Sequence, residues 1–508
     1  MARKKKDIVL QSILIESYAA EGKSIARIDG KVVFVERVVP GDVVNVRITK
    51  SKKDWAEGFP LEFISYSKER TEPFCSHFGI CGGCQWQMLP YAKQLEYKQK
   101  QVTDNLQRIA KVKLPPIAPI IGAAETKYYR NKLEYTFATE EFTPEKPRAS
   151  LNSSEGGALL AHNSQLFKAS NNISGYLKGE DLSVGQTPPS GVRGHGFAGF
   201  HARGFWSKVV DIEKCYLQAE PTNEVRLAIK NFALQKGYSF YNLREQKGFL
   251  RTIQVRLCET GEWMANIMFG EDDMEKVKSV LDYVLEKFSN ITSLLYTINT
   301  KRNDSLHGLE PIAYYGKGYV VEKLEDYQFK IGPKSFFQTN TKQGTKLYEV
   351  ARDFAELTGK EILYDLYCGT GSIGIFCSKN ATKVIGVEVV EEAIADAKEN
   401  AQLNGIDTTY FYAGDVIDIC DDDFFAKHGR PNVIITDPPR AGMHEKLVKK
   451  INEIAAPIVV YVSCNPATQA RDLALLDEKY EVTKVLPVDM FPHTLHIENV
   501  VQLKLRKF

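Results

Sequence analysis

A short glycine-rich stretch between two apolar runs restricts the folds available to this chain more than any other feature of its sequence. Ile362–Leu366 has the pattern of a buried strand, and Gly369, Gly371 and Gly374 follow it in the spacing G-x-G-x-x-G. A second apolar run ends at Glu388, 19 residues after Gly369. Glycines let the backbone turn closely around a ligand, and a carboxylate at this distance accepts hydrogen bonds from ribose hydroxyls. The stretch therefore predicts a nucleotide-cofactor crevice.

Regular alternation of strand and helix patterns surrounds this stretch from residue 331 to 508. Such alternation predicts a doubly wound, Rossmann-like α/β domain. Too few residues separate the last two strand patterns, 482–486 and 499–505, for a crossover helix, so we expect the final strand to be antiparallel. That arrangement argues against a nicotinamide-dependent oxidoreductase, the other class that a glycine loop suggests. The expected strands end at Leu366, Glu388, Tyr412, Asp437 and Ser463, with helices over 391–404 and 443–454.

The first 66 residues show short alternating runs that lie too close together for helices between them. They predict a small antiparallel barrel of the OB-like type that binds oligonucleotides, with a purely structural β module as the alternative. Residues 22–36, together with 39–42, resemble the TRAM domain of RNA-modifying enzymes. That resemblance implies RNA contacts by Lys50, Lys52, Lys53 and Trp55.

Three cysteines, Cys75, Cys81 and Cys84, lie in the spacing C-x5-C-x2-C. Thiolates this close suit a metal ion or a cluster, and nine cysteines in a large chain do not suggest a disulfide framework. The fourth ligand is either the distant Cys215 or His77, which would complete a Cys3His zinc site. Zinc ribbons usually carry two C-x2-C pairs, so we expect a [4Fe-4S] cluster held by Cys75, Cys81, Cys84 and Cys215.

Composition sets the remaining limits. The chain has 508 residues, 43% of them hydrophobic and 26% charged, with a net charge of +2. No apolar run approaches the roughly 20 residues needed to cross a bilayer, and the basic start lacks a secretory signal pattern, so we expect a cytoplasmic protein. Residues 67–330 predict a mixed α+β domain. Within it, residues 144–194 are rich in Ser, Asn and Gly, which favours a largely disordered surface insertion.

Polar residues follow the expected strands of the C-terminal domain. Asp437 precedes two prolines, which suits a carboxylate held at a strand tip. Cys464 leaves a buried strand just before an expected helix start, which would stabilise its thiolate. Glu498 precedes an apolar strand, where burial would raise its pKa toward that of a working base. Cys368 is the rival nucleophile, but inside the glycine loop it would face the cofactor.

Together these motifs resemble the bacterial RNA uracil-C5 methyltransferases, in the branch that carries a TRAM domain and an iron–sulfur cluster. The resemblance spans nearly the whole chain, and the insertion at 144–194 is its main departure. The motifs are Ser335–Asn340, the cysteine triplet with Cys215, Asp365–Gly371, Asp437–Arg440, Ser463–Pro466 and His496–Glu498.

The resemblance implies a class I methyltransferase domain that uses S-adenosylmethionine. It also implies that Cys464 attacks C6 of uracil and that Glu498 removes the C5 proton. The implied cofactor contacts are Gln338, Tyr367, Glu388 and Asp437.

The most similar members of that family methylate 23S ribosomal RNA, whereas the tRNA branch lacks both the barrel and the cysteines. We therefore expect a monomer that methylates C5 of a uridine in 23S rRNA and binds neither DNA nor a membrane. The alternatives are a tRNA uracil-C5 methyltransferase and a non-catalytic RNA-binding assembly factor. The presence of both Cys464 and Glu498 argues against the latter.

Overall fold

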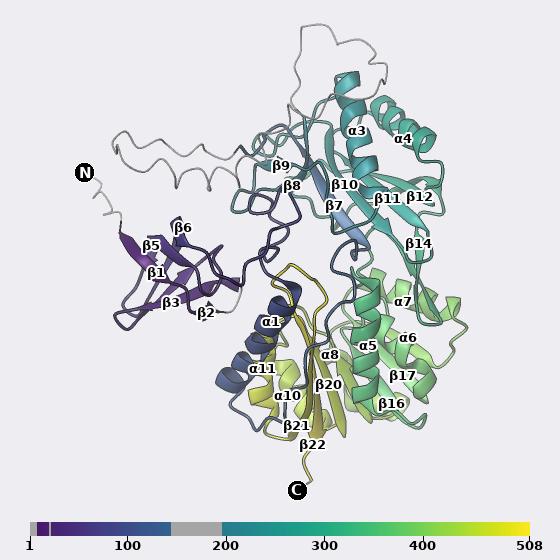
Figure 1. Cartoon of the computed structure of the whole chain (residues 1–508). Coiled ribbons are helices and arrows are strands. Elements are labelled where there is room, and N and C mark those ends of the chain that lie inside the picture. Colours follow the sequence, from purple (N-terminus) through teal and green to yellow (C-terminus); the bar gives the residue numbers. More distant parts are fainter. Residues whose placement is uncertain (1–7, 20–21, 144–195, 508) are drawn as a thin grey trace, which may run out of the picture.

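The computed structural model describes residues 8–19, 22–143 and 196–507. Figure 1 shows a small barrel on one side, a central sheet with helices α3 and α4, and a C-terminal sheet covered by helices. The predicted insertion at 144–194 lies outside the described residues. Among the described residues, no helix is long and apolar enough to cross a membrane.

The barrel consists of six strands in one sheet, in the order β1-β5-β6-β4-β3-β2. Neighbouring strands are antiparallel except β4 and β6, which run parallel. Small and β-branched side chains fill the interior, and Ala26, Val33 and Val44 are each at most 1% exposed. The strands are β1 (Val9–Leu14), β2 (Ser17–Tyr18), β3 (Ser24–Ile28), β4 (Lys31–Val35), β5 (Val43–Ser51) and β6 (Trp55–Ser65).

The central sheet has the strand order β13-β12-β11-β10-β7-β8-β9, in which β11 and β12 run parallel and the other neighbours antiparallel. Alternation along β7 explains its two faces, because Leu133, Tyr135 and Phe137 enter the core beneath α3 and α4 while the polar residues between them face the other side. The elements are β7 (Lys132–Ala138), β8 (Phe197–His201), β9 (Val209–Asp211), α3 (Thr222–Lys236), β10 (Leu250–Leu257), β11 (Trp263–Phe269), α4 (Met274–Lys287), β12 (Ser293–Ile298) and β13 (Ile312–Gly316). A hairpin of β14 (Val320–Leu324) and β15 (Tyr327–Ile331) follows.

The C-terminal sheet has the order β18-β17-β16-β19-β20-β22-β21. Its first five strands are parallel, and β22 is antiparallel to both β20 and β21, which confirms the predicted direction of the last strand. The order reverses between β16 and β19, so this is where a doubly wound sheet binds its ligand. The strands are β16 (Ile362–Leu366), β17 (Lys383–Glu388), β18 (Thr409–Ala413), β19 (Val433–Thr436), β20 (Ile458–Ser463), β21 (Tyr480–Val488) and β22 (Glu498–Leu505).

Helices cover both faces of this sheet. One face packs on α5 (Thr341–Ala355), α6 (Ser372–Cys377), which continues into the 3-10 turn η3 (Ser378–Asn380), and α7 (Glu391–Leu403). The other face packs on α8 (Val416–Ile419), α9 (Asp422–His428), α10 (Glu445–Ile454) and α11 (Pro466–Leu476).

A further helix on this second face comes from far earlier in the chain. It is α1 (Tyr91–Asn105), which continues as the π-helical turn η2 (Leu106–Ala110). Val102 and Leu106 are fully buried in the core between the sheet and these helices. Figure 1 shows α1 alongside α11. The chain therefore reaches the C-terminal sheet before it forms the central sheet.

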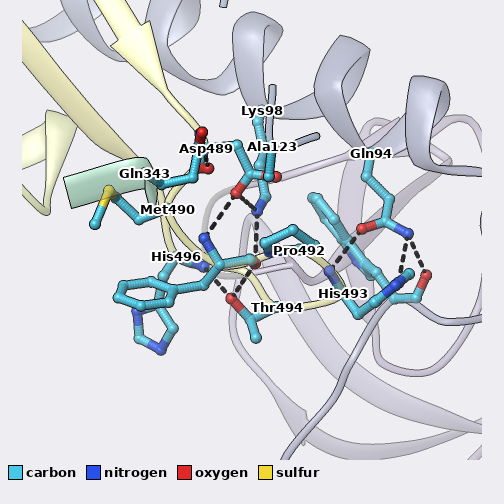
Figure 2. A network of polar contacts seen from close by, with 12 residues as sticks. Gln94, Lys98, Ala123, Gln343, Asp489, Met490, Pro492, His493, Thr494 and His496 are labelled. Atoms are coloured by element: carbon cyan, nitrogen blue, oxygen red, sulfur yellow. Dashed lines mark hydrogen bonds and ion pairs between the residues drawn. The ribbon is translucent and has the colours of Figure 1, made fainter. Parts of the chain in front are cut away.

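The connection from β21 to β22 is held by a buried ion pair from α1 (Figure 2). Lys98 Nζ donates to Asp489 Oδ1 at 2.6 Å, and neither side chain is exposed. The Tyr91 hydroxyl and the Phe491 amide also donate to the Asp489 carboxylate, at 2.8 and 3.1 Å. Burial lowers the pKa of Lys98, and the charge of Asp489 opposes that shift. A charge buried so fully is tolerable only while its partner is present.

A second contact from α1 fixes the same connection. Gln94 Oε1 accepts from the His493 amide at 2.8 Å, and Gln94 Nε2 lies 3.0 Å from His493 Nδ1. Burial lowers the pKa of His493 to about 4, so its ring is neutral near pH 7. These contacts end a few residues before β22 begins at Glu498.

We expect Lys98→Met to lower the free energy of unfolding by about 3–5 kcal/mol, because it leaves the Asp489 carboxylate buried without its cation. Urea unfolding followed by circular dichroism measures the change. Lys100→Met on the same helix is the control, because Lys100 forms an exposed i,i+4 pair with Asp104 that contributes about 0.3–0.5 kcal/mol. Equal effects of the two substitutions would contradict a structural role for the buried pair.

Candidate active site

The glycine loop turns sharply between β16 and α6. Tyr367, Gly369 and Gly371 have φ values of 61°, 52° and 76°, in the left-handed region. Glycine adopts this region freely, whereas for Tyr367 it is strained, which is common at functional sites. A Cβ at Gly371 would lie 2.8 Å from the Phe411 ring, so glycine is also required there for packing.

Asp365, at the end of β16, holds the loop from below. Its Oδ2 accepts from the Gly374 amide at 2.8 Å, while its Oδ1 is buried without a hydrogen-bond partner. Burial raises the pKa of Asp365 to about 7. A Cβ at Gly374 would lie only 3.0 Å from Oδ2, so the third glycine permits this close approach.

Of the predicted cofactor contacts, Tyr367 and Glu388 lie at the loop. Glu388, at the end of β17, accepts from the amides of Gly369 and Val390 at 3.3 and 3.1 Å. Carboxylate oxygens have further lone pairs, so Glu388 can also accept from ribose hydroxyls. Gln338 is 9% exposed, and its backbone carbonyl accepts from the side-chain amide of Asn131, the residue before β7, at 2.8 Å. The central sheet thus fixes the position of one predicted contact in the C-terminal crevice.

Asp437 and Glu498 form an electrostatically coupled pair. Asp437 follows β19, and Glu498 begins β22 and is 6% exposed. Burial raises the pKa of Asp437 to about 7. Burial and the neighbouring Asp437 raise the pKa of Glu498 well above its usual range, which agrees with the expectation from its apolar strand. Near pH 7 the pair therefore retains at least one proton.

Cys464 lies beside this pair, between the end of β20 and the start of α11. Burial, then Glu498 and Asp437, raise the pKa of its thiol to about 11, while Arg440 opposes the shift. Burial and the two nearby carboxyl groups therefore outweigh the effects that favour the Cys464 thiolate, and the net shift is upward. Asn465 caps α11 by accepting from the Ala467 amide at 3.1 Å.

The rival thiol, Cys368, faces the protein interior. It is 6% exposed, and a Cβ at Gly386 of β17 would lie 2.9 Å from its Sγ. Burial raises the pKa of Cys368 well above its usual value. Its position against the sheet leaves Cys464 as the cysteine beside the two coupled carboxyl groups.

Three residues near the crevice were not singled out from the sequence. Tyr348 of α5 donates to or accepts from Ser372 Oγ at 2.8 Å, and Asp437, Asp365 and Glu498 all help to raise its pKa. Arg440 favours the Cys464 thiolate. Phe336 is 71% exposed, and its carbonyl accepts from Thr370 of the glycine loop at 3.4 Å. An exposed aromatic residue in the stretch 335–340 was the available signal for Phe336.

The four predicted metal-binding cysteines come together although Cys215 is distant in sequence. Burial raises the pKa of Cys81 to about 12, and Cys215, Cys84 and Cys75 add to the shift. Cys81 and Cys84 pack against the core that contains Cys215. Within the described chain, however, no three His, Cys, Asp or Glu side chains are arranged to hold a metal ion.

His77 is less suited to metal binding than the cysteines. Its Nε2 accepts from the Glu213 amide at 3.5 Å, and its Nδ1 lies 3.3 Å from Ser76 Oγ. A ring nitrogen that accepts a hydrogen bond cannot also donate its lone pair to a metal. The Cys3His alternative would require at least the contact between Nε2 and the Glu213 amide to break.

The predicted RNA contacts of the barrel lie at the turn between β5 and β6. Lys50 Nζ lies 4.8 Å from the centre of the Trp55 ring, and Lys52 and Lys53 are exposed beside it. An aromatic ring with adjacent lysines is suited to single-stranded RNA.

Comparisons with known proteins identify the same two regions, the C-terminal domain and the barrel. The family model for tRNA (uracil-5-)-methyltransferase matches residues 314–413 and 418–506, and the TRAM domain model matches residues 10–61. RNA methyltransferases named as uncharacterized, from Bacteroides thetaiotaomicron and Porphyromonas gingivalis, are 48% and 46% identical to this chain. Each match covers 96% of this chain, and 100% and 98% of the respective relative.

A solved structure also matches nearly the whole chain. It is the tRNA (uracil-54, C5)-methyltransferase of Pyrococcus abyssi in complex with S-adenosyl-L-homocysteine, which is 26% identical with a TM-score of 0.69. The match covers 97% of this chain and 100% of that chain. The fold and the crevice thus define an S-adenosylmethionine-dependent class I methyltransferase. The chain belongs to the RNA uracil-C5 methyltransferase family, with an N-terminal TRAM domain.

This match corrects one expectation about the substrate. We expected a tRNA enzyme to lack the barrel and the cysteine region, yet a protein named for tRNA aligns with 97% of this chain. Overall domain architecture therefore does not distinguish ribosomal RNA from tRNA as the substrate.

The raised pKa of Asp437 predicts a specific pH dependence. The folded protein binds the proton of the Asp437 carboxyl group more tightly than the unfolded chain does. The stabilisation of the folded state that results is complete below about pH 4 and is lost as the pH rises through about 7. Between about pH 5.5 and 7, the unfolding free energy of wild type should fall relative to that of Asp437→Asn, on the order of 1 kcal/mol per pH unit. Urea unfolding without cofactor measures this difference. Asp407→Asn, at an exposed carboxyl group, is the control and should have the same pH dependence as wild type. If the unfolding free energies of Asp437→Asn and wild type changed in parallel with pH, the raised pKa of Asp437 would be contradicted.

Proposed function

We propose that this protein methylates C5 of a specific uridine in 23S ribosomal RNA. The observation that supports the chemistry best is the grouping of Cys464, Asp437 and Glu498 beside the glycine loop. The exposed Phe336 offers a ring against which an unstacked base can lie. A tRNA uridine is the second candidate substrate, because the Pyrococcus abyssi protein is named for tRNA.

Gln338, Tyr367, Glu388 and Asp437 are the proposed cofactor contacts. Glu388 would accept from the ribose hydroxyls, and Tyr367 and Gln338 lie at the loop and at the start of α5. S-adenosylmethionine, when bound, supplies an electrophilic methyl group on a positively charged sulfur. A positive charge in this crevice lowers the pKa of nearby thiol and carboxyl groups. Cys464 and the Asp437–Glu498 pair would therefore lose protons more readily once the crevice is filled.

Cys464 is the proposed nucleophile. Its thiolate would add to C6 of uracil, and the electron pair of the C5–C6 double bond would move to form an enolate with a nucleophilic C5. Arg440 stabilises the thiolate before the attack. After C5 has accepted the methyl group, Glu498 as carboxylate would take the C5 proton, and the C6–sulfur bond would break to restore the double bond. The high pKa of Glu498 in the free protein makes it a strong acceptor for that proton.

These roles predict opposite behaviour for two variants. Cys464→Ala should form no adduct and no product, whereas Glu498→Gln should stall as a covalent protein–RNA complex that carries a methylated base. Incubation with total cellular RNA and cofactor should then give a slower band on a denaturing gel for Glu498→Gln. Sequencing the trapped RNA distinguishes 23S rRNA from tRNA. Adduct formation by Cys464→Ala, or normal turnover by Glu498→Gln, would overturn the mechanism.

We also propose that Cys75, Cys81, Cys84 and Cys215 hold a [4Fe-4S] cluster. All four are free thiols, and their mutual electrostatic effects place them in one group. Zinc ribbons usually carry two C-x2-C pairs, whereas one compact triplet with a distant fourth cysteine favours a cluster over a single ion. Its chemical role here would be structural.

Protein purified without oxygen should contain about four iron and four acid-labile sulfide atoms per chain. Cys215→Ser should lose them and lower the thermal stability of the central region. Cys420→Ser, at a buried cysteine beneath the C-terminal sheet, is the control and should retain both. Stoichiometric zinc without sulfide would refute the cluster.

A further inference from the structure

Aromatic rings and lysines form a surface beside the cysteine group that the proposed chemistry does not use. We call it the Tyr128 surface and define it by Lys127, Tyr128, Lys214 and Tyr216. Lys127 Nζ lies 4.2 Å from the centre of the Phe74 ring and 5.8 Å from that of Tyr216. Lys214 Nζ lies 5.5 Å from the centre of the Tyr216 ring.

Tyr128 is held in an unusual conformation on this surface. It is 41% exposed, and its φ of 57° is rare for a residue with a large side chain. Its amide donates to the Tyr216 carbonyl at 2.7 Å, and the two rings lie 6.1 Å apart. The strained backbone at Tyr128 thus keeps an aromatic ring exposed to solvent. Such strain is typical of residues that contact a ligand.

The two lysines give this surface an uncompensated positive charge. Lys127 and Lys214 are exposed, and neither forms an ion pair with a carboxylate of the described residues. Their closest recorded partners are aromatic rings, which leave the ammonium groups able to contact phosphates. A partner with both negative charge and flat, stackable groups fits this combination.

Ring contacts link the Tyr128 surface to the connection that leads to the candidate active site. The Phe74 ring lies 5.0 Å from that of His493, in the connection that leads to Glu498. Arg130, two residues after Tyr128, lies 4.9 Å from the centre of the Phe491 ring. Arg130 and Arg440 both lower the pKa of His496, so the positive charges of both arginines act on this residue, two positions before Glu498.

We infer that the Tyr128 surface binds the single-stranded RNA that flanks the target uridine. Tyr128 stacks on an unpaired base, and Lys127 and Lys214 contact the phosphates on either side. A base that leaves its stack to enter the crevice must also leave its neighbours accessible, and aromatic rings with cations bind such nucleotides without sequence preference. This inference rests on the proposed RNA methylation and adds a second contact outside the crevice.

The cysteine group supports this surface from below. Phe74 precedes Cys75 and Tyr216 follows Cys215, and their rings lie 5.4 Å apart. Anchoring Cys75 and Cys215 therefore fixes the positions of the rings over which Lys127 and Lys214 lie. The cysteine group thus supports RNA binding by holding this surface in place, without electron transfer.

Binding of a uridine-containing 20-nucleotide RNA tests the inference. Tyr128→Leu should weaken binding at least about fivefold, and Tyr128→Phe should bind like wild type because the ring is retained. Lys127→Ala/Lys214→Ala should lower the slope of log affinity against log salt by about 1.4, since each single-strand phosphate contact contributes about 0.7. The matching RNA duplex should bind all these proteins equally.

Controls in the same region are Tyr315→Leu, with 48% exposure on the edge strand β13, and Lys278→Ala on α4. Both should bind RNA like wild type, and every variant should keep wild-type cofactor affinity. Ultraviolet cross-linking of 4-thiouridine RNA should place cross-links at Tyr128 or Tyr216. Unchanged binding in the Tyr128 and lysine variants, with wild type active, would overturn this inference alone. Wild type that neither binds nor methylates RNA would overturn the proposed function itself.

Discussion

The buried ion pair between Lys98 and Asp489 connects the parts of this protein that the candidate active site needs. Lys98 belongs to a helix that precedes the central sheet, and Asp489 belongs to the connection that leads into β22. The Asp489 carbonyl also accepts from Gln343 of α5 at 2.8 Å. Asp489 therefore links an early helix, the helix that follows Gln338, and the strand that begins at Glu498. Since neither charge is tolerable alone, the pair specifies one arrangement of these segments.

Local sequence patterns predicted the C-terminal sheet well. The glycine spacing and the two apolar runs placed β16, the turn and β17 correctly, because strand burial and left-handed turns impose patterns within a few residues. The short link before the last strand predicted its reversed direction for the same reason. Strands β18 and β19 end one residue from the expected positions, at Ala413 and Thr436. The alternation in residues 9–66 predicted the barrel but not the parallel pairing of β4 with β6.

Interactions between segments far apart in the sequence could not be predicted from such local patterns. Nothing in the polar helix Tyr91–Asn105 shows that it packs on α11 rather than on its neighbours in sequence. The roles of Cys464 and Glu498 were suggested by motifs, but the high thiol pKa depends on burial and on the combined charges of Glu498 and Asp437. Charges sum over space, so their effect appears only once the fold has brought the groups together.

The packing of α1 on the C-terminal sheet affects the order in which the protein folds during synthesis. A ribosome delivers Lys98 long before Asp489, and 391 residues separate the two. Until the C-terminal sheet emerges, the apolar side chains Val102 and Leu106 of α1 have no core to enter. Contacts of such sequence separation form slowly, and exposed apolar surface promotes aggregation meanwhile. The crevice is completed only once the segment from Asp489 to Glu498 has left the ribosome, so a chain that lacks this segment cannot act on RNA.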